Sequence, residues 1–115
     1  MKFPFKPTAV YNVHGGQIVE VTGVGHRIER PQGGYSRDYW FYTGTVKWDD
    51  TGKTNEGYID AGFLCADTQK GMDEIREMSE AMMAYLNANG AWSGEGKPDG
   101  WHAHDRKKNK ALGTV

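Results

Sequence analysis

The spacing with the most evident chemical potential is His102-Ala103-His104-Asp105, near the C-terminal end. In an extended strand alternate side chains project to one side, so His102 and His104 would both reach one metal ion, with Asp105 nearby. Only ten residues follow, and the remaining histidines, His14 and His26, lie far upstream. An exposed polar tail is therefore the favoured interpretation. A small metal-dependent enzyme at these three residues stays open as the last of three alternatives.

Other catalytic signatures are missing from the sequence. No serine or cysteine stands in a nucleophile motif, and there is no glycine-rich phosphate loop. Gly23-Val24-Gly25 begins like a dinucleotide fingerprint, but Ile28 occupies the third glycine position and no helix pattern follows. We therefore expect no cofactor and a function other than catalysis.

Aromatic residues with basic neighbours are the remaining chemical signal. One group lies on or near a single predicted strand: Tyr35, Arg37, Tyr39, Phe41 and Lys47. Aromatic side chains are favoured at the centres of protein interfaces, which indicates a face that binds a partner protein. Aromatic rings also stack on bases while basic groups neutralise phosphates, so single-stranded nucleic acid is the alternative partner. That alternative adds a second group from the C-terminal region: Trp92, Trp101, Arg106, Lys107 and Lys108.

The strand that would position the first group is residues 39–48, the longest run of aromatic and β-branched residues in the chain. Alternation directs Trp40, Tyr42, Gly44, Val46 and Trp48 to one face and Tyr39, Phe41, Thr43, Thr45 and Lys47 to the other. The first face can line a core. The second would expose Tyr39 and Phe41 unless another element or a partner covers them.

Further strands are predicted on both sides of this one. Turn signals separate runs at 9–13, 17–24 and 54–59, and residues 26–30 can extend the second. The short apolar run 61–65 is either a last strand or a turn of helix. Val19 and Val21 should share a face, and Gly23 and Gly25 indicate a bulge or bend. Residues 49–53, with glycine late in the turn, predict a type I turn followed by a bulge, so 54–59 should return antiparallel.

The one clear helix is predicted between Asp67 and Asn89. Asp67 or Thr68 can cap its start; Gly71 is the alternative cap, with Glu74 then in the capping-box position. At 100° per residue, the apolar side chains fall on one face. They are Met72, Ile75, Met78, Met82, Met83, Tyr85 and Leu86. This face is expected to pack on the sheet.

Length and charge limit the class of protein. The chain has 115 residues and a net charge of −1, so one domain is expected and no global field attracts nucleic acid or an anionic membrane. A single cysteine, Cys65, the lack of an apolar leader and the lack of a membrane-spanning run predict a cytoplasmic protein without a membrane partner. Within the single domain 1–115 we expect a β-rich body (1–66), an amphipathic helix (67–90) and a Gly/Trp-rich arm with a basic tail (91–115).

The expected fold is α+β: a strongly bent antiparallel sheet, with one long helix packed on it and an irregular C-terminal arm. The glycine bends and short hairpins are similar to those of small SH3-like or open barrels, a likeness of architecture that implies no activity. The expected function is a small non-enzymatic binding or adaptor protein. It would dock on another macromolecule through its exposed aromatic face, with a protein as the favoured partner and a homodimer as a further arrangement.

Overall fold

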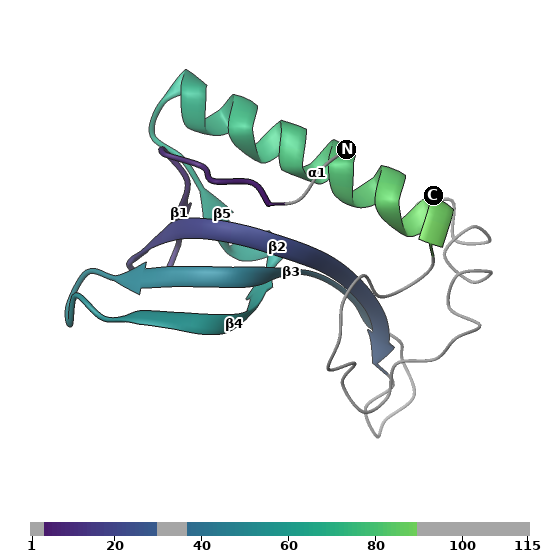
Figure 1. Cartoon of the computed structure of the whole chain (residues 1–115), viewed down its shortest axis with the longest axis horizontal. Helices are drawn as coiled ribbons and strands as arrows, with labels where there is room; N and C mark the ends of the chain where they lie inside the picture. The colour runs from purple at the N-terminus through teal and green to yellow at the C-terminus, as the bar shows by residue number, and fades with distance from the viewer. Residues whose placement is uncertain (1–3, 30–36, 90–115) are drawn as a thin grey trace.

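The computed structural model describes residues 4–29 and 37–89, which form a bent antiparallel sheet with one long helix across it (Figure 1). The α+β architecture predicted from the sequence is confirmed. In chain order the elements are β1 (Tyr11–Asn12), β2 (Gly16–Glu29), β3 (Arg37–Trp48), β4 (Thr54–Asp60), the 3₁₀ turn η1 (Ala61–Phe63), β5 (Leu64–Cys65) and α1 (Gln69–Asn89). The predicted C-terminal arm lies outside the described residues.

The sheet has the strand order β4-β3-β2-β1-β5, and every pairing in it is antiparallel. β3 and β4 form the predicted hairpin. The Trp48 N–H donates to the Lys53 carbonyl at 2.9 Å, and Gly52 adopts a positive φ of 68°, as a type I turn with a following bulge requires. Within the described part of the chain β4 and β5 do not pair with each other, so the sheet is open rather than a closed barrel.

Two irregularities bend β2, where the register with β3 shifts between Ile18 and Glu20 and again between Val21 and Gly23. Each shift leaves one residue of β2 unpaired, which increases the local twist of the strand. The second bulge adjoins Gly23, where a bend was predicted; the first lies four residues earlier, and Gly25 pairs with Phe41 without a shift. The expectation that Val19 and Val21 share a face is wrong, because the first bulge turns Val19 to solvent (39% exposed) while Val21 is fully buried.

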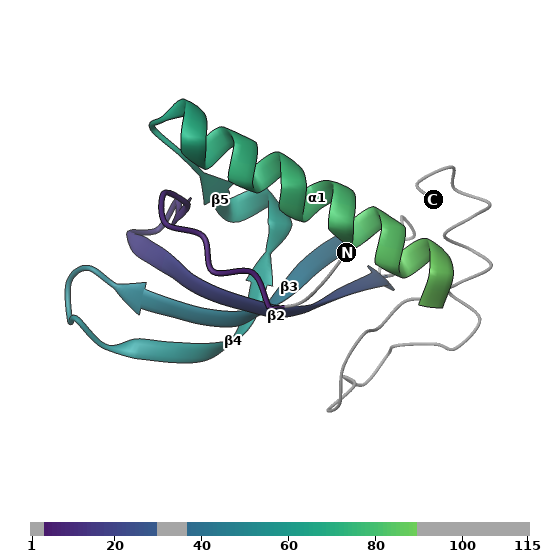
Figure 2. The same cartoon turned by 45° about the horizontal axis from the view of Figure 1, so that its top comes forward.

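Helix α1 covers one face of the sheet, and both views show it running diagonally above the strands (Figures 1 and 2). Thr68 caps it, since the Thr68 hydroxyl accepts from the Gly71 N–H at 3.1 Å. Most of the predicted apolar face packs inward; Met72, at 49% exposed, does not. The buried core joins the helix to the strands: Val10, Ile18, Val21, Val24, Tyr42, Val46, Ile59, Met78, Met82 and Leu86.

Glu74 has a tertiary role rather than the capping role predicted as an alternative. Its carboxylate accepts hydrogen bonds from the backbone N–H groups of Thr8 and Ala9, both at 3.0 Å. The same N-terminal segment pairs with β2, where Phe5 and Val21 exchange backbone hydrogen bonds of 3.0 and 2.9 Å. The segment before β1 is therefore held between α1 and β2. No helix in the described part of the chain is long and apolar enough to cross a membrane.

At Gly44 the backbone of β2 lies against β3 where a side chain would otherwise stand. A Cβ at Gly44 would collide with the backbone carbonyl of Glu20, whereas one at Gly16 would meet side-chain atoms of Val46 and Trp48 at 2.5 and 3.0 Å. A rotamer change can relieve the second contact, but relief of the first requires the bulge in β2 to move. The close approach at Gly44 is thus fixed by backbone on both sides.

We predict that Gly44→Ala lowers the free energy of unfolding by about 2–3 kcal/mol, the upper range for overpacking a tight site. Gly16→Ala is the matched control, with the same change in a neighbouring strand, and should cost about 1 kcal/mol or less because side chains can adjust. Urea unfolding of the two variants at one protein concentration measures the difference. Equal losses would contradict the rigid contact at Glu20.

Candidate functional site

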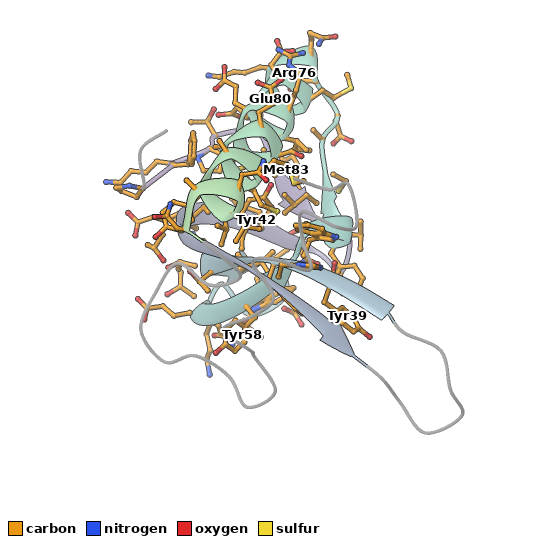
Figure 3. The ribbon with its side chains drawn as sticks, turned by 90° about the vertical axis from the view of Figure 1, so that its right-hand side faces the viewer. Tyr39, Tyr42, Tyr58, Arg76, Glu80 and Met83 are labelled. Carbon is orange, nitrogen blue, oxygen red and sulfur yellow. The ribbon has the colours of Figure 1, made fainter. Side chains whose placement is uncertain are left out.

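Three aromatic rings form a row on the face of the sheet that points away from α1, and Figure 3 shows two of them, Tyr39 and Tyr58, on that side. Tyr39 and Phe41 stack with ring centroids 5.5 Å apart and an interplanar angle of 21°. Phe41 then meets Tyr58 edge-on, at 6.2 Å and 64°. We call these three residues the aromatic row. It forms because alternation along β3 sends Tyr39 and Phe41 to this face, and the hairpin register sets Tyr58 of β4 opposite Thr43.

The aromatic row is partly open to solvent. Tyr58 is 54% exposed, and Tyr39 and Phe41 are half-buried. The helix and the described core lie on the opposite face of the sheet, where Figure 3 places Tyr42 between the strands and α1. The rings are held by paired backbone on β3 and β4, so their positions are fixed before any partner arrives.

Two acidic residues of β4 lie next to the aromatic row. Asp60 is the cross-strand neighbour of Phe41, and Glu56 precedes Tyr58 by two residues on the same face. The predicted basic residue Lys47 shares this face but pairs with Thr54 at the far end of the hairpin. Tyr58, the nearest ring of the row, lies opposite Thr43, which is four residues from Lys47, or about 13 Å along the strand.

The structure brings together only part of the residue set predicted from the sequence. Tyr39 and Phe41 are adjacent, and the backbone of Arg37 pairs with Glu29 at the end of the β2–β3 ladder. Tyr35 lies outside the described residues. So do the predicted nucleic-acid residues Trp92, Trp101, Arg106, Lys107 and Lys108, and the predicted metal ligands His102, His104 and Asp105. Within the described ranges, no group of three or more His, Cys, Asp or Glu side chains is placed to hold a metal ion.

A cavity of about 440 Å³ lies on the other side of the sheet, between α1, β3 and the segment from η1 to β5. Its lining residues are Trp40, Tyr42, Ala61, Gly62, Leu64, Ile75, Ser79, Met82 and Met83. Behind it His26, which is fully buried, stacks on Trp40 with centroids 3.8 Å apart and an interplanar angle of 9°. Among the lining residues only Ser79, Trp40 and Tyr42 carry polar side-chain groups, so the cavity offers a binding surface rather than an acid–base pair.

Sequence reasoning missed Tyr58, Tyr42 and the stack of His26 on Trp40. The signal for Tyr58 was present, because the turn at 49–53 sets Lys47 opposite Thr54 and therefore Thr43 opposite Tyr58. Alternation placed Tyr42 on the core face, but it did not predict that this residue lines a cavity. The stack of His26 on Trp40 depends on the register of β2 after two bulges, for which the sequence carries no direct signal.

We predict that Tyr42 causes a loss of stability at alkaline pH. Burial raises the pKa of the Tyr42 hydroxyl above its ordinary value of 10.0. Below about pH 10 both states keep this proton; above it the unfolded chain releases the proton while the folded chain retains it, so the free energy of unfolding falls as pH rises. The slope contributed is about 1.4 kcal/mol per pH unit, until the folded state also ionises.

Urea unfolding of the native chain and of Tyr42→Phe, from about pH 8 to about pH 11.5, isolates this effect. The native chain should lose stability more steeply above pH 10 than Tyr42→Phe. Tyr58→Phe, which changes an exposed ring by the same atom, should behave as the native chain does. Identical slopes for the native chain and Tyr42→Phe would show that the hydroxyl is not buried as described.

Comparisons of this chain with protein-family models, with curated proteins and with solved structures gave no significant match. A function is therefore inferred from the geometry of the chain itself. The aromatic row on the outer face and the cavity beneath α1 are two features of the described residues that could offer a binding surface.

Proposed function

We propose that this protein is a small non-enzymatic adaptor that docks on another protein through the aromatic row. The observation that supports the proposal is the arrangement of Tyr39, Phe41 and Tyr58 as one partly exposed row on the face opposite the helix. The hydrophobic core does not use these rings, since it forms on the other face. Their apolar area thus lies outside the core that the described residues form, and the 54% exposure of Tyr58 supports a binding role for the row.

The chemistry of the row suits a protein surface. Aromatic side chains supply large contact areas and lose little conformational entropy on binding, and tyrosine adds a hydroxyl that can exchange water for a partner group. Thr22 and Thr43 continue the same face with short polar side chains, and the Thr22 hydroxyl donates to the Thr43 carbonyl at 3.2 Å. An apolar centre with a polar margin is the usual composition of a protein interface.

The charge around the row favours a protein over nucleic acid. Glu56 and Asp60 lie beside Tyr58 and Phe41, where a phosphate backbone bound across the rings would meet two carboxylates. Binding of single-stranded nucleic acid remains the second candidate because the C-terminal segment is basic, with five basic against two acidic residues over 97–110. That candidate requires the tail to outweigh the carboxylates, and it implies steep weakening with salt.

The proposal predicts site-specific capture of a protein partner. A photo-crosslinking amino acid at Thr45, on the outer face of β3, should give a discrete adduct in the native cell. The same group at Glu80, on the exposed side of α1 and away from the sheet (Figure 3), is the matched control and should not give that adduct. The paired change Tyr39→Ser and Phe41→Ser should abolish the adduct while far-ultraviolet circular dichroism stays unchanged.

The adduct also identifies the class of partner. Loss of the adduct on protease treatment, with resistance to nuclease, supports the adaptor function. Sensitivity to nuclease would replace it with the nucleic-acid alternative, which fluorescent single-stranded oligonucleotides at low and physiological salt would then quantify. An adduct of twice the chain mass would report self-association instead. Capture that is equal at Thr45 and Glu80, or insensitive to the paired change, would overturn the proposal.

A further inference from the structure

Strand β4 forms one side of the sheet, and no other described strand pairs with its outer edge. Figures 1 and 2 both show it at the margin of the coloured chain, on the side away from α1. The Trp48 N–H bonds the Lys53 carbonyl, so by alternation Asn55, Gly57 and Ile59 direct their backbone groups toward β3. The residues between them direct theirs outward. An outer edge of this kind is a template for another strand.

Gly57 stands at the centre of β4, and no contact among the described residues requires a glycine there. A Cβ built there would have no atom within 4 Å, and the residue does not have a positive φ. By contrast, backbone carbonyls block a Cβ at both Gly44 and Gly71. Glycine in a strand interior costs stability, and it often marks the place where another backbone approaches closely.

The charges on β4 decide which second strand fits. For two antiparallel copies of the seven-residue strand, three registers pair the outward-directed residues over at least five positions. One sets Glu56 opposite Glu56 of the second copy, and another sets Glu56 opposite the second copy's Asp60. Both place like charges directly across the ladder, which is destabilising. The third centres the twofold axis on Gly57, pairs Glu56 with Tyr58 and Thr54 with Asp60, and avoids every such clash.

We propose that two copies of this chain associate through antiparallel pairing of β4, with the two Gly57 residues on the twofold axis. The register uses the whole of β4 and brings the two glycine backbones together where side chains are absent. It also sets the two Tyr58 rings on a diagonal of one face, so the aromatic rows of the two copies adjoin. The pairing rests on the edge, the glycine and the charges, and it holds whether or not the aromatic row binds a partner.

Charge reversal across the Glu56–Tyr58 pair tests the register. Sedimentation velocity of the full chain should show a species of about twice 12.8 kDa that dissociates on dilution. Tyr58→Glu and Tyr58→Lys both remove the ring, but only the first places a carboxylate opposite Glu56. Tyr58→Glu should therefore dimerise about tenfold more weakly than Tyr58→Lys, and adding Glu56→Lys to Tyr58→Glu should restore the dimer.

The same series excludes the other registers and the absence of a dimer. If Tyr58 lay opposite Tyr58 of the second copy, both substitutions would place like charges across the ladder and weaken association equally. If Glu56 lay opposite Glu56 of the second copy, neither charged substitution at Tyr58 would change the dimer affinity more than a neutral substitution does. A native chain that stays monomeric across the concentration series would overturn the proposal, and so would equal behaviour of Tyr58→Glu and Tyr58→Lys.

A thiol placed on the twofold axis gives a second, independent readout. In the Cys65→Ser background, Gly57→Cys sets two thiols across a non-hydrogen-bonded pair, at a separation that a disulfide spans. Mild oxidation should give a covalent dimer. Asn55→Cys on the same strand is the matched control. In the proposed register it lies opposite Ile59 of the second copy, not opposite residue 55 of that copy, and it should crosslink far less. Crosslinking that is stronger at Asn55 than at Gly57 would overturn the register.

Discussion

The structure depends on the way β2 bends against β3. The bulges at Val19 and Thr22 twist one strand of the longest hairpin, and Gly44 lets the Glu20 carbonyl approach where a side chain would prevent it. On this bent strand Ile18, Val21 and Val24 are all buried in one core with Met78, Met82 and Leu86 of α1.

Alternation along β3 divides its aromatic residues between the two faces of the sheet. Neighbours in one strand go to opposite faces, so Trp40 and Tyr42 join the core and the cavity wall while Tyr39 and Phe41 form the outer row. The core-side residues are fixed by burial, as the stack of His26 on Trp40 shows. The outer rings lie outside the core that the described residues form, and they contact one another across β3 and β4. Our proposal of a binding role rests on their being partly exposed on that face.

Much of this arrangement follows from local rules that are readable in the sequence. Alternation along residues 39–48 separates the two faces, and the glycine at position 52 sets the turn and with it the register of β4. The helix is found from its apolar spacing, and Thr68 caps it as one of the two expected starts. The candidate partner face was predictable to this extent, and Tyr58 would have been included had the hairpin register been followed across the turn.

The rest was not predictable because it depends on tertiary contacts. A bulge shifts alternation by one residue, so Val19 faces solvent although its spacing from Val21 places both on one face. Glu74 has the residue type and spacing of a capping box, but the N–H groups of Thr8 and Ala9 bind its carboxylate from more than sixty positions away. Met72 belongs to the apolar arc yet lies beyond the area that the sheet can cover. In each case the tertiary arrangement, and not the local sequence pattern, determines where the side chain lies.

Among the described residues, α1 covers one face of the sheet, and no strand pairs with the outer edge of β4. The opposite face carries aromatic rings and the edge carries a glycine at its centre, and the two meet at Tyr58. Carboxylates flank that point on the same strand, and they oppose most ways of adding a further strand while permitting one. The same two charges disfavour phosphate on the face. In both proposals Glu56 and Asp60 act by excluding unsuitable partners at the edge and on the face, and apolar contact supplies the attraction.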